Sequence, residues 1–134
     1  MTTTLQVGTA LEPRTIGPIT QTDIVRFAGA GGDFNPLHHD PEFAARAGFT
    51  APIAMGQMQA GILAAALTDR VGVEHLRALE VRFVAPVEIG DVLTVTGTVT
   101  EVGDGVATLA LAMTKADAAT VVTGTASVGV PVTP

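Results

Sequence analysis

The sequence predicts an α+β fold in which a curved antiparallel sheet wraps around one long central helix. Apolar residues recur at helical spacing in several segments of the first half of this 134-residue chain. One segment, residues 56–72, is apolar nearly all round, which is typical of a helix buried in a core. After residue 75, apolar and polar residues alternate, which is the period of antiparallel strands with one covered face. The length fits one domain, so we expect residues 1–134 to form a single unit.

A short strand and a helix are expected first. Residues 7–20 contain a strand that Pro13 interrupts, because proline has no N–H to donate to a sheet, and then a turn at residues 17–18. Residues 22–31 follow as a helix with its apolar side chains on one face. The expected caps are Thr20 or Thr22 at its start and Gly31 with Gly32 at its end.

Two further helices are expected in the middle of the chain. Residues 40–49 predict a short helix with Pro41 at its first position and Gly48 as its stop. The long helix over residues 56–72 has one stripe of large apolar side chains, and alanines fill much of its remaining surface. Its small side chains predict that the sheet wraps closely around it.

The second half of the chain predicts four strands of period two. In each strand one face is apolar, as where Leu93, Val95 and Val99 alternate with threonines. We expect the four strands to form one antiparallel meander joined by short turns. The strands are expected over residues 78–86, 91–103, 105–117 and 119–130, with turns at 102–105 and 115–120.

Composition limits the partners and the location of the protein. The net charge is −6 and the basic residues form no stripe, so binding to nucleic acid or to a membrane surface is not expected. Charged residues are only 15% of the chain, which favours burial of surface in a homodimer or a higher homo-oligomer. The lack of cysteine excludes disulfides and is compatible with a cytoplasmic location. The first residues do not have the pattern of a signal peptide, and the longest apolar run is too short for a membrane span.

Much of the polar chemistry of the chain is concentrated in one loop, GGDFNPLHHD at residues 31–40. Pro36 keeps Asn35 out of the α region, so no α-helix can continue through this loop. A loop that folds back can bring Asp33 and His38 together, and a carboxylate beside an imidazole can move protons to and from water. Asn35 can hold a substrate carbonyl or brace the loop.

The same loop also fits a purely structural interpretation, which the spacing does not exclude. Aspartate and asparagine are common in turns, where their side chains bond nearby backbone groups. We expect Asp40 to cap the next helix, His39 to point away from the loop and His75 to be structural. Three histidines without a cysteine give no recognised metal-ligand spacing, so no metal site is expected.

Gly56 stands where the long helix is expected to begin. The first N–H groups of a helix have no partner within the helix, and the helix dipole is positive there. Because glycine lets a ligand oxygen approach the backbone, this N–H can stabilise an oxyanion. An ordinary glycine at a helix start is the alternative interpretation. The sequence contains neither a glycine-rich phosphate loop nor a serine nucleophile elbow.

These segments together resemble the MaoC-like, (R)-specific enoyl-CoA hydratase family of the hot-dog fold. DFNPLH at residues 33–38 is similar to the hydratase motif of the family, and PIAMGQMQAGIL at 52–63 is similar to its helix start. VRFVAPVEIGDVLTVTGTV at 81–99 looks like its strand pair, and the resemblance covers about residues 8–130. The DFNPLH motif is specific, whereas many hot-dog thioesterases share the strand pattern.

The resemblance implies a role for each residue of the loop. Asp33 and His38 would be a catalytic dyad that holds and activates water, and Asn35 would support the loop and the substrate. The N–H of Gly56 would polarise the thioester carbonyl. Water would add reversibly across the double bond of a trans-2-enoyl thioester, carried by CoA or an acyl carrier, to give the (R)-3-hydroxyacyl product. No cofactor would be needed.

The chain departs from the family pattern at the start of the long helix. Many family members have histidine before the glycine, where this chain has Met55, and Gln57 occupies a position that is often apolar. Because both members of the dyad are present, we still expect a hydratase. The two substitutions bear on the acyl group and on the shape of the oxyanion site.

Two other functions fit the same resemblance. A hot-dog thioesterase usually has a carboxylate on or near its central helix, but here that helix has no acid before Asp69, near its far end. A non-catalytic subunit that shapes the acyl tunnel of a heterodimer tends to lose the dyad, whereas this chain keeps it. The sequence therefore favours the hydratase over both alternatives.

Overall fold

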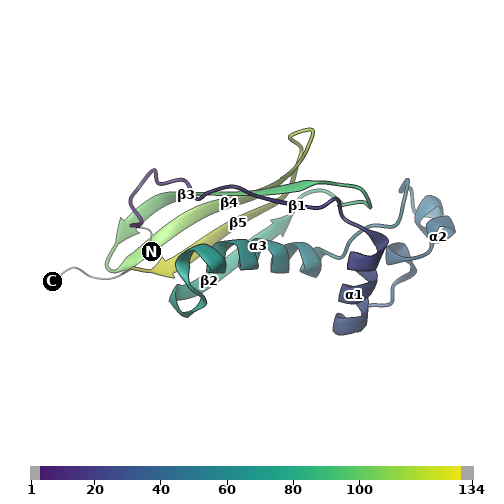
Figure 1. The fold of residues 1–134 in the computed structure, drawn as a ribbon, viewed down its shortest axis with the longest axis horizontal. Helices are drawn as coiled ribbons and strands as arrows, with labels where there is room; N and C mark the ends of the chain where they lie inside the picture. Colours follow the sequence, from purple (N-terminus) through teal and green to yellow (C-terminus); the bar gives the residue numbers. More distant parts are fainter. Residues whose placement is uncertain (1–3, 131–134) are drawn as a thin grey trace.

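The computed structural model describes residues 4–130, and a five-stranded sheet with one long helix against one face dominates it (Figure 1). The strands are β1 (Arg14–Ile16), β2 (Leu76–Phe83), β3 (Leu93–Gly103), β4 (Val106–Lys115) and β5 (Thr120–Gly129). The helices are α1 (Gln21–Gly31), α2 (Pro41–Arg46) and α3 (Gly56–Val71), with single 3₁₀ turns η1 (Pro36–His38) and η2 (Val73–His75). The α+β prediction is confirmed.

The order of strands in the sheet is β1-β3-β4-β5-β2, and all neighbours are antiparallel. The predicted four-strand meander is therefore wrong for one strand. β3, β4 and β5 do follow one another, but β2 pairs with β5 at the far edge of the sheet instead of with β3. Alternation of residue type shows which face of a strand is covered, but it does not show which strand lies beside it.

The predicted turn between β3 and β4 is confirmed. Asp104 and Gly105 form a two-residue turn with φ angles of 54° and 76°. Aspartate followed by glycine is favoured there, because this hairpin turn needs positive φ at both positions. The alternation along β3 is confirmed as well: Leu93, Val95 and Val99 are buried, and Thr96, Thr98 and Thr100 are exposed.

Helix α3 lies along the apolar face of the sheet (Figure 1). The residues that it buries are Met58, Gln59, Leu63, Ala66 and Leu67. The expectation of a helix buried all round is wrong, because Gly61 and Ala65 are exposed. A sheet covers only one side of a helix, so the small residues of the opposite side stay open in this chain. No helix within residues 4–130 is both long enough and apolar enough to cross a lipid bilayer.

Helices α1 and α2 lie beyond the end of the sheet, near the start of α3 (Figure 1). Thr20 is the N-cap of α1: its Oγ1 accepts the N–H of Asp23 at 3.1 Å, and the Asp23 carboxylate accepts the N–H of Thr20 at 2.9 Å. This is a capping box. The bonds from the backbone and the hydroxyl of Thr20 hold the pKa of Asp23 below its usual value. Gly32 ends the helix with φ of 70°, as predicted.

The capping box makes a pH-dependent contribution to stability. We expect Thr20→Ala to lower the free energy of unfolding by about 1 kcal/mol at neutral pH. Because the pKa of Asp23 is lowered in the folded state, the carboxylate contributes fully above its ordinary value of 3.8. That contribution is lost as the pH falls through the lower pKa of the folded protein. Urea unfolding should show the difference between wild type and Asp23→Asn narrowing as the pH falls below 3.8; a constant difference contradicts the prediction.

Candidate active site

The loop after α1 folds back as expected from its proline. The N–H of Asp33 donates to the carbonyl of Ala28, and Asn35 has an extended backbone with φ of −58° and ψ of 127°. No α-helix runs through the loop, although residues 36–38 make one 3₁₀ turn that the sequence did not predict. The side chain of Asn35 starts this turn by accepting the N–H of Leu37 at 3.0 Å.

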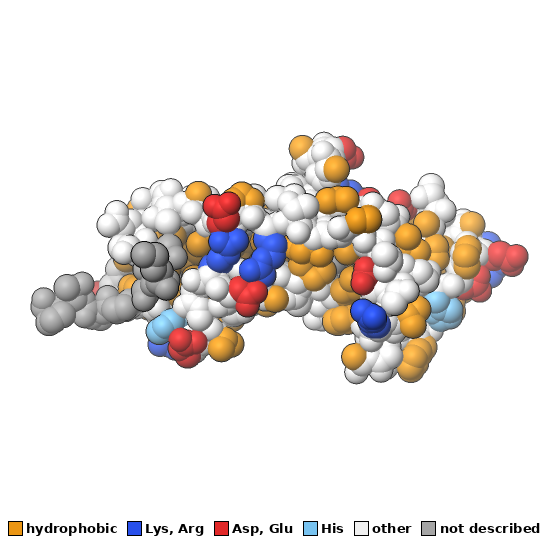
Figure 2. Space-filling model, viewed as in Figure 1, with side chains coloured by type: hydrophobic (Ala, Val, Ile, Leu, Met, Phe, Trp, Pro, Cys, Tyr) orange, Lys and Arg blue, Asp and Glu red, His pale blue; other side chains and the backbone are white. Residues whose placement is uncertain are grey.

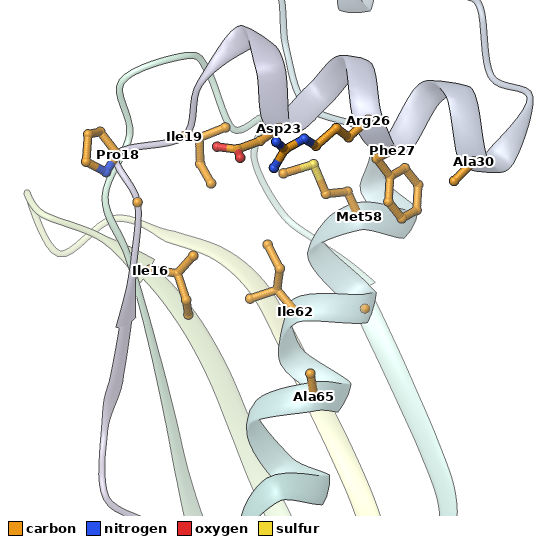
Figure 3. A pocket seen from close by; sticks show the side chains of 12 residues that line it. Ile16, Pro18, Ile19, Asp23, Arg26, Phe27, Ala30, Met58, Ile62 and Ala65 are labelled. Atoms are coloured by element: carbon orange, nitrogen blue, oxygen red, sulfur yellow. The ribbon is translucent and has the colours of Figure 1, made fainter.

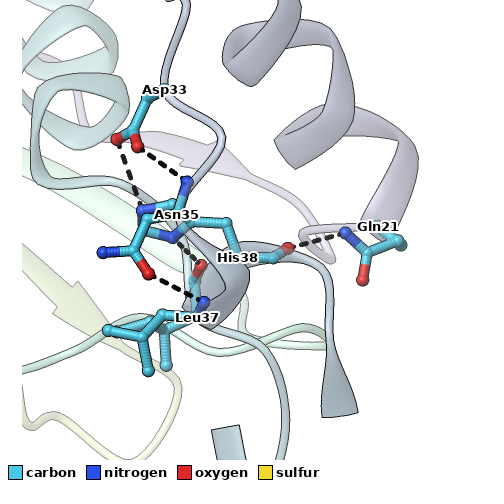
Figure 4. A network of polar contacts seen from close by, with 6 residues as sticks. Gln21, Asp33, Asn35, Leu37 and His38 are labelled. Atoms are coloured by element: carbon cyan, nitrogen blue, oxygen red, sulfur yellow. Dashed lines mark hydrogen bonds and ion pairs between the residues drawn. The ribbon is translucent and has the colours of Figure 1, made fainter. Parts of the chain in front are cut away.

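Asp33 and His38 are brought together (Figure 4). His38 Nε2 lies 3.3 Å from Asp33 Oδ2. The two side chains differ in burial, because that of His38 is 11% exposed and that of Asp33 is 46% exposed. The pair therefore has one member fixed within the protein and one that solvent or a ligand can reach.

The other nitrogen of His38 fixes the ring and its tautomer. Nδ1 lies 2.8 Å from the carbonyl oxygen of Ile53. Because a carbonyl oxygen can only accept, Nδ1 must carry a proton and donate it. In the neutral ring Nε2 is then unprotonated, and it is the nitrogen that faces Asp33. The ring nitrogen that can exchange a proton, Nε2, therefore lies beside the Asp33 carboxylate.

The 3.3 Å contact also limits where protons can be. A neutral Nε2 and an ionised carboxylate are both acceptors, so they attract each other only when a proton lies between them. The pair can hold one proton on either member, or it can receive the O–H of a water molecule. A pair of this kind can both take and give a proton at one place.

The loop is tied to the segment that leads into α3. The N–H of Ile53 donates to the carbonyl of Leu37 at 3.0 Å, which adds to the bond between His38 and Ile53. On the other side, the Gln21 side chain of α1 donates to the His38 carbonyl at 2.9 Å (Figure 4). Sequence reasoning missed the contributions of Gln21 and Ile53. Nothing in the sequence marks them, since they lie 17 and 15 residues away from His38.

Asn35 is exposed, and its one bond from the side chain goes to the backbone of its own turn. Its N–H also donates to Asp33 Oδ1 at 3.3 Å, which helps to hold that carboxylate beside His38. The sequence left two roles open for Asn35, holding a substrate carbonyl or bracing the loop. Its contacts in the structure are those of a residue that braces the loop.

Gly56 is the first residue of α3, as predicted. Met55, at the N-cap, offers no side-chain bond to the helix. Within residues 4–130, no hydrogen-bond partner is seen for the N–H of Gly56. A Cβ at this position would be crowded by the Phe83 ring, since it would lie 3.1–3.3 Å from three of its carbons, and the ring would have to shift by a few tenths of an ångström. The helix start is therefore favourable for a glycine, and within the described residues its N–H has no partner.

The remaining polar residues singled out in the sequence have structural contacts. Asp40 caps α2, because its Oδ1 accepts the N–H groups of Glu42 and Phe43 at 3.0 and 3.2 Å. His75 lies at the surface, 3.6 Å from the carboxylate of Glu74. Asp69 pairs with Arg14 at 2.7 Å, far along α3 from Gly56. Within the described residues, no three His, Cys, Asp or Glu side chains are grouped so that they could hold a metal ion.

Comparison of the sequence with known proteins finds a matching family and related hydratases. The MaoC like domain family matches residues 3–122. The (R)-specific enoyl-CoA hydratase of Aeromonas caviae is 34% identical over 114 residues, which are 81% of this chain and 84% of that protein. That of Rhodospirillum rubrum is 39% identical over 85 residues, which are 61% of this chain but only 58% of that protein.

The fold is shared with a solved structure. The structure described as the (R)-hydratase from A. caviae involved in PHA biosynthesis superposes with a TM-score of 0.85 and 30% identity, and it covers 95% of this chain and 98% of its own. The hot-dog arrangement expected from the resemblance is therefore confirmed. With a family match over most of its length and a relative that aligns along most of both chains, this chain belongs to the MaoC-like domain family.

Proposed function

We propose that this protein is a hydratase that reversibly adds water across the double bond of a trans-2-enoyl thioester to give the (R)-3-hydroxyacyl thioester. The observation that carries this proposal is the contact of 3.3 Å between the half-exposed Asp33 carboxylate and the oriented His38 ring. The names of the similar proteins, (R)-specific enoyl-CoA hydratases, support the same reaction.

The reaction needs a group that takes a proton and a group that gives one. The oxygen of water bonds to C3 of the substrate, one hydrogen of the water leaves to a base, and one proton is delivered to C2. We assign these two transfers to Asp33 and His38 as a pair, because they face each other and can hold one proton between them. The pair ends with the same number of protons as it had before, so the step balances with water and the substrate alone.

Negative charge develops on the thioester oxygen when water attacks C3. We assign the stabilisation of this charge to the N–H of Gly56, which begins a helix of 16 residues and lacks a hydrogen-bond partner among the described residues. Because Gly56 has no side chain, a carbonyl oxygen can approach its backbone N–H closely, next to the Phe83 ring. Asn35 would then act through the loop, by holding the Asp33 carboxylate in place.

The unit that carries out this reaction is proposed to be a homodimer of single MaoC-like domains spanning residues 1–134, in the cytoplasm. β2 supports the dimer, since it is an edge strand whose outer side has no partner strand within residues 4–130, and its last residue, Phe83, is 47% exposed. The substrate is proposed to be an acyl-CoA or an acyl-carrier thioester. The net charge of −6 favours CoA over an acidic carrier protein.

Incubation with crotonyl-CoA tests the proposed reaction. We expect the enoyl-thioester absorbance to fall while no free thiol is released, because water adds to carbon and leaves the thioester bond intact. The stereochemistry of the product is checked by oxidation with an (R)-specific dehydrogenase. Release of thiol would show a thioesterase instead, and silence with enoyl thioesters of several chain lengths would show a non-catalytic subunit.

A further inference from the structure

A groove separate from the dyad lies between α1, α3 and the end of β1 (Figure 3). Its volume is about 740 Å³, which is within the usual range of small-molecule pockets. The lining is mostly apolar, and in Figure 3 Met58 and Ile62 of α3 lie opposite Ile16 and Phe27. Figure 2, in the view of Figure 1, shows hydrophobic side chains gathered to the left of α1, with one red and one blue side chain over α1 itself.

The groove lies on the other flank of α3 from the proposed oxyanion site. Gly56 packs against Phe83 at the end of β2, whereas the groove is bordered by Ile16 of β1, at the opposite edge of the sheet. Neither Asp33 nor His38 lines it. A molecule bound here would therefore not lie over the dyad.

The floor of the groove is kept open by a glycine in the middle of α3. Gly61 is exposed, lines the groove, and has no atom within 4 Å of the place where a Cβ would be. Glycine in a helix interior lowers stability relative to alanine. No neighbouring atom crowds this position, so a larger residue would fit there, and it would fill the open space of the groove.

One side of the groove carries a cation that has no ion-pair partner among residues 4–130. Arg26 of α1 lines the groove, and the ion pairs within these residues do not include it. Asp23 also lines the groove and lies beside Arg26 in Figure 3, and the charge of Arg26 helps to lower the pKa of this carboxylate. The two groups are not within ion-pair distance, and the carboxylate accepts the N–H of Thr20 in the capping box. Arg26 is exposed, so its guanidinium can contact an anion in addition to Asp23, at the rim of the apolar trough.

We propose that this groove binds a single-chain carboxylate, a fatty acid of medium chain length, with the chain along Gly61 and Ile62 and the carboxylate on Arg26. An apolar trough with an exposed arginine at its rim matches the two ends of such a molecule, and the carboxylate would bind on the side of the guanidinium away from Asp23. The site is distinct from the hydration site and does not depend on the proposed reaction. It would let a free acid bind the protein while an enoyl thioester occupies the dyad.

The binding of decanoate, measured by displacement of the fluorescent fatty acid dansyl-undecanoate, tests this proposal. We expect one saturable site per chain, and binding about tenfold weaker in Arg26→Gln, the effect of one lost charge-assisted hydrogen bond. Gly61→Leu should abolish binding by filling the trough. Gly29→Leu is the matched control, because Gly29 is also an exposed helical glycine with open space but lies outside the groove. Arg46→Gln, on α2, is the control for charge.

Several outcomes would overturn the proposal. They are an absence of saturable binding to the wild type, equal binding by Gly61→Leu and Gly29→Leu, or equally tight binding of decyltrimethylammonium, which has the wrong charge. Competition between decanoate and crotonyl-CoA would place the acid at the dyad instead. A change of oligomeric mass in Gly61→Leu would make the groove an interface between copies. Circular dichroism confirms folding of each variant, and since binding needs no turnover, this test is independent of the hydration assay.

Discussion

Asp33→Asn and His38→Ala are each expected to lower kcat/KM for the hydration of crotonyl-CoA by about 10²–10⁴-fold, the usual effect of losing an acid/base group. Asparagine keeps the shape of Asp33 and can still accept the N–H of Asn35, but its amide cannot exchange a proton. Alanine at position 38 removes the ring that lies 3.3 Å from the carboxylate. Stopped-flow or steady-state absorbance of the enoyl thioester gives the rates.

The double variant separates a pair from two independent groups. If Asp33 and His38 act as a unit, the combined substitution should cost little more than either one alone. His75→Ala is the control, because this histidine lies at the surface beside Glu74 and has no contact with the dyad. Rates near those of the wild type in both single variants, with folding intact, would show that the loop is only structural.

Leu63→Ala is expected to lower the free energy of unfolding by about 2–5 kcal/mol, the range for removal of a fully buried leucine side chain. Leu63 has no exposed surface and joins α3 to the sheet. Its Cδ2 would be 3.2 Å from a Cβ added to Gly124, so the leucine fills the space that this glycine leaves on β5. Alanine would leave a cavity there that a glycine cannot fill.

Denaturation in urea, followed by circular dichroism, measures this loss. Val73→Ala is the control, because Val73 is 72% exposed and its substitution should change stability by no more than about 0.5 kcal/mol. If the two variants unfold at the same denaturant concentration, α3 does not depend on Leu63 for its packing on the sheet.

The features that are local in sequence were the ones that could be predicted. Capping by Thr20 and Asp40, the turn at Asp104 and Gly105, the glycine end of α1 and the glycine start of α3 all depend on residues within four positions of one another. The alternation along β3 and β4 has the same origin, since a strand turns successive side chains to opposite faces. Local rules therefore located nearly every element of the fold.

The candidate site was predicted in part. The residue types of the DFNPLH loop, and the bend that Pro36 imposes, indicated that Asp33 and His38 could meet. The tautomer of His38 could not be predicted, because it depends on the carbonyl of Ile53 across a fold of the chain. The same is true of Gln21, which holds the loop from a different helix.

By itself, the sequence determined the helices, the strands, their caps and the presence of an aspartate and a histidine in one bent loop. Only the tertiary structure decided that β2 pairs with β5, that one side of α3 stays open around Gly61, and that an apolar groove with Arg26 at its rim lies apart from the dyad. The physical reason is the distance along the chain over which each interaction acts. Backbone preferences and side-chain periodicity act over a few residues, whereas strand order, cavities and the orientation of a ring depend on surfaces that meet only when the whole chain has packed.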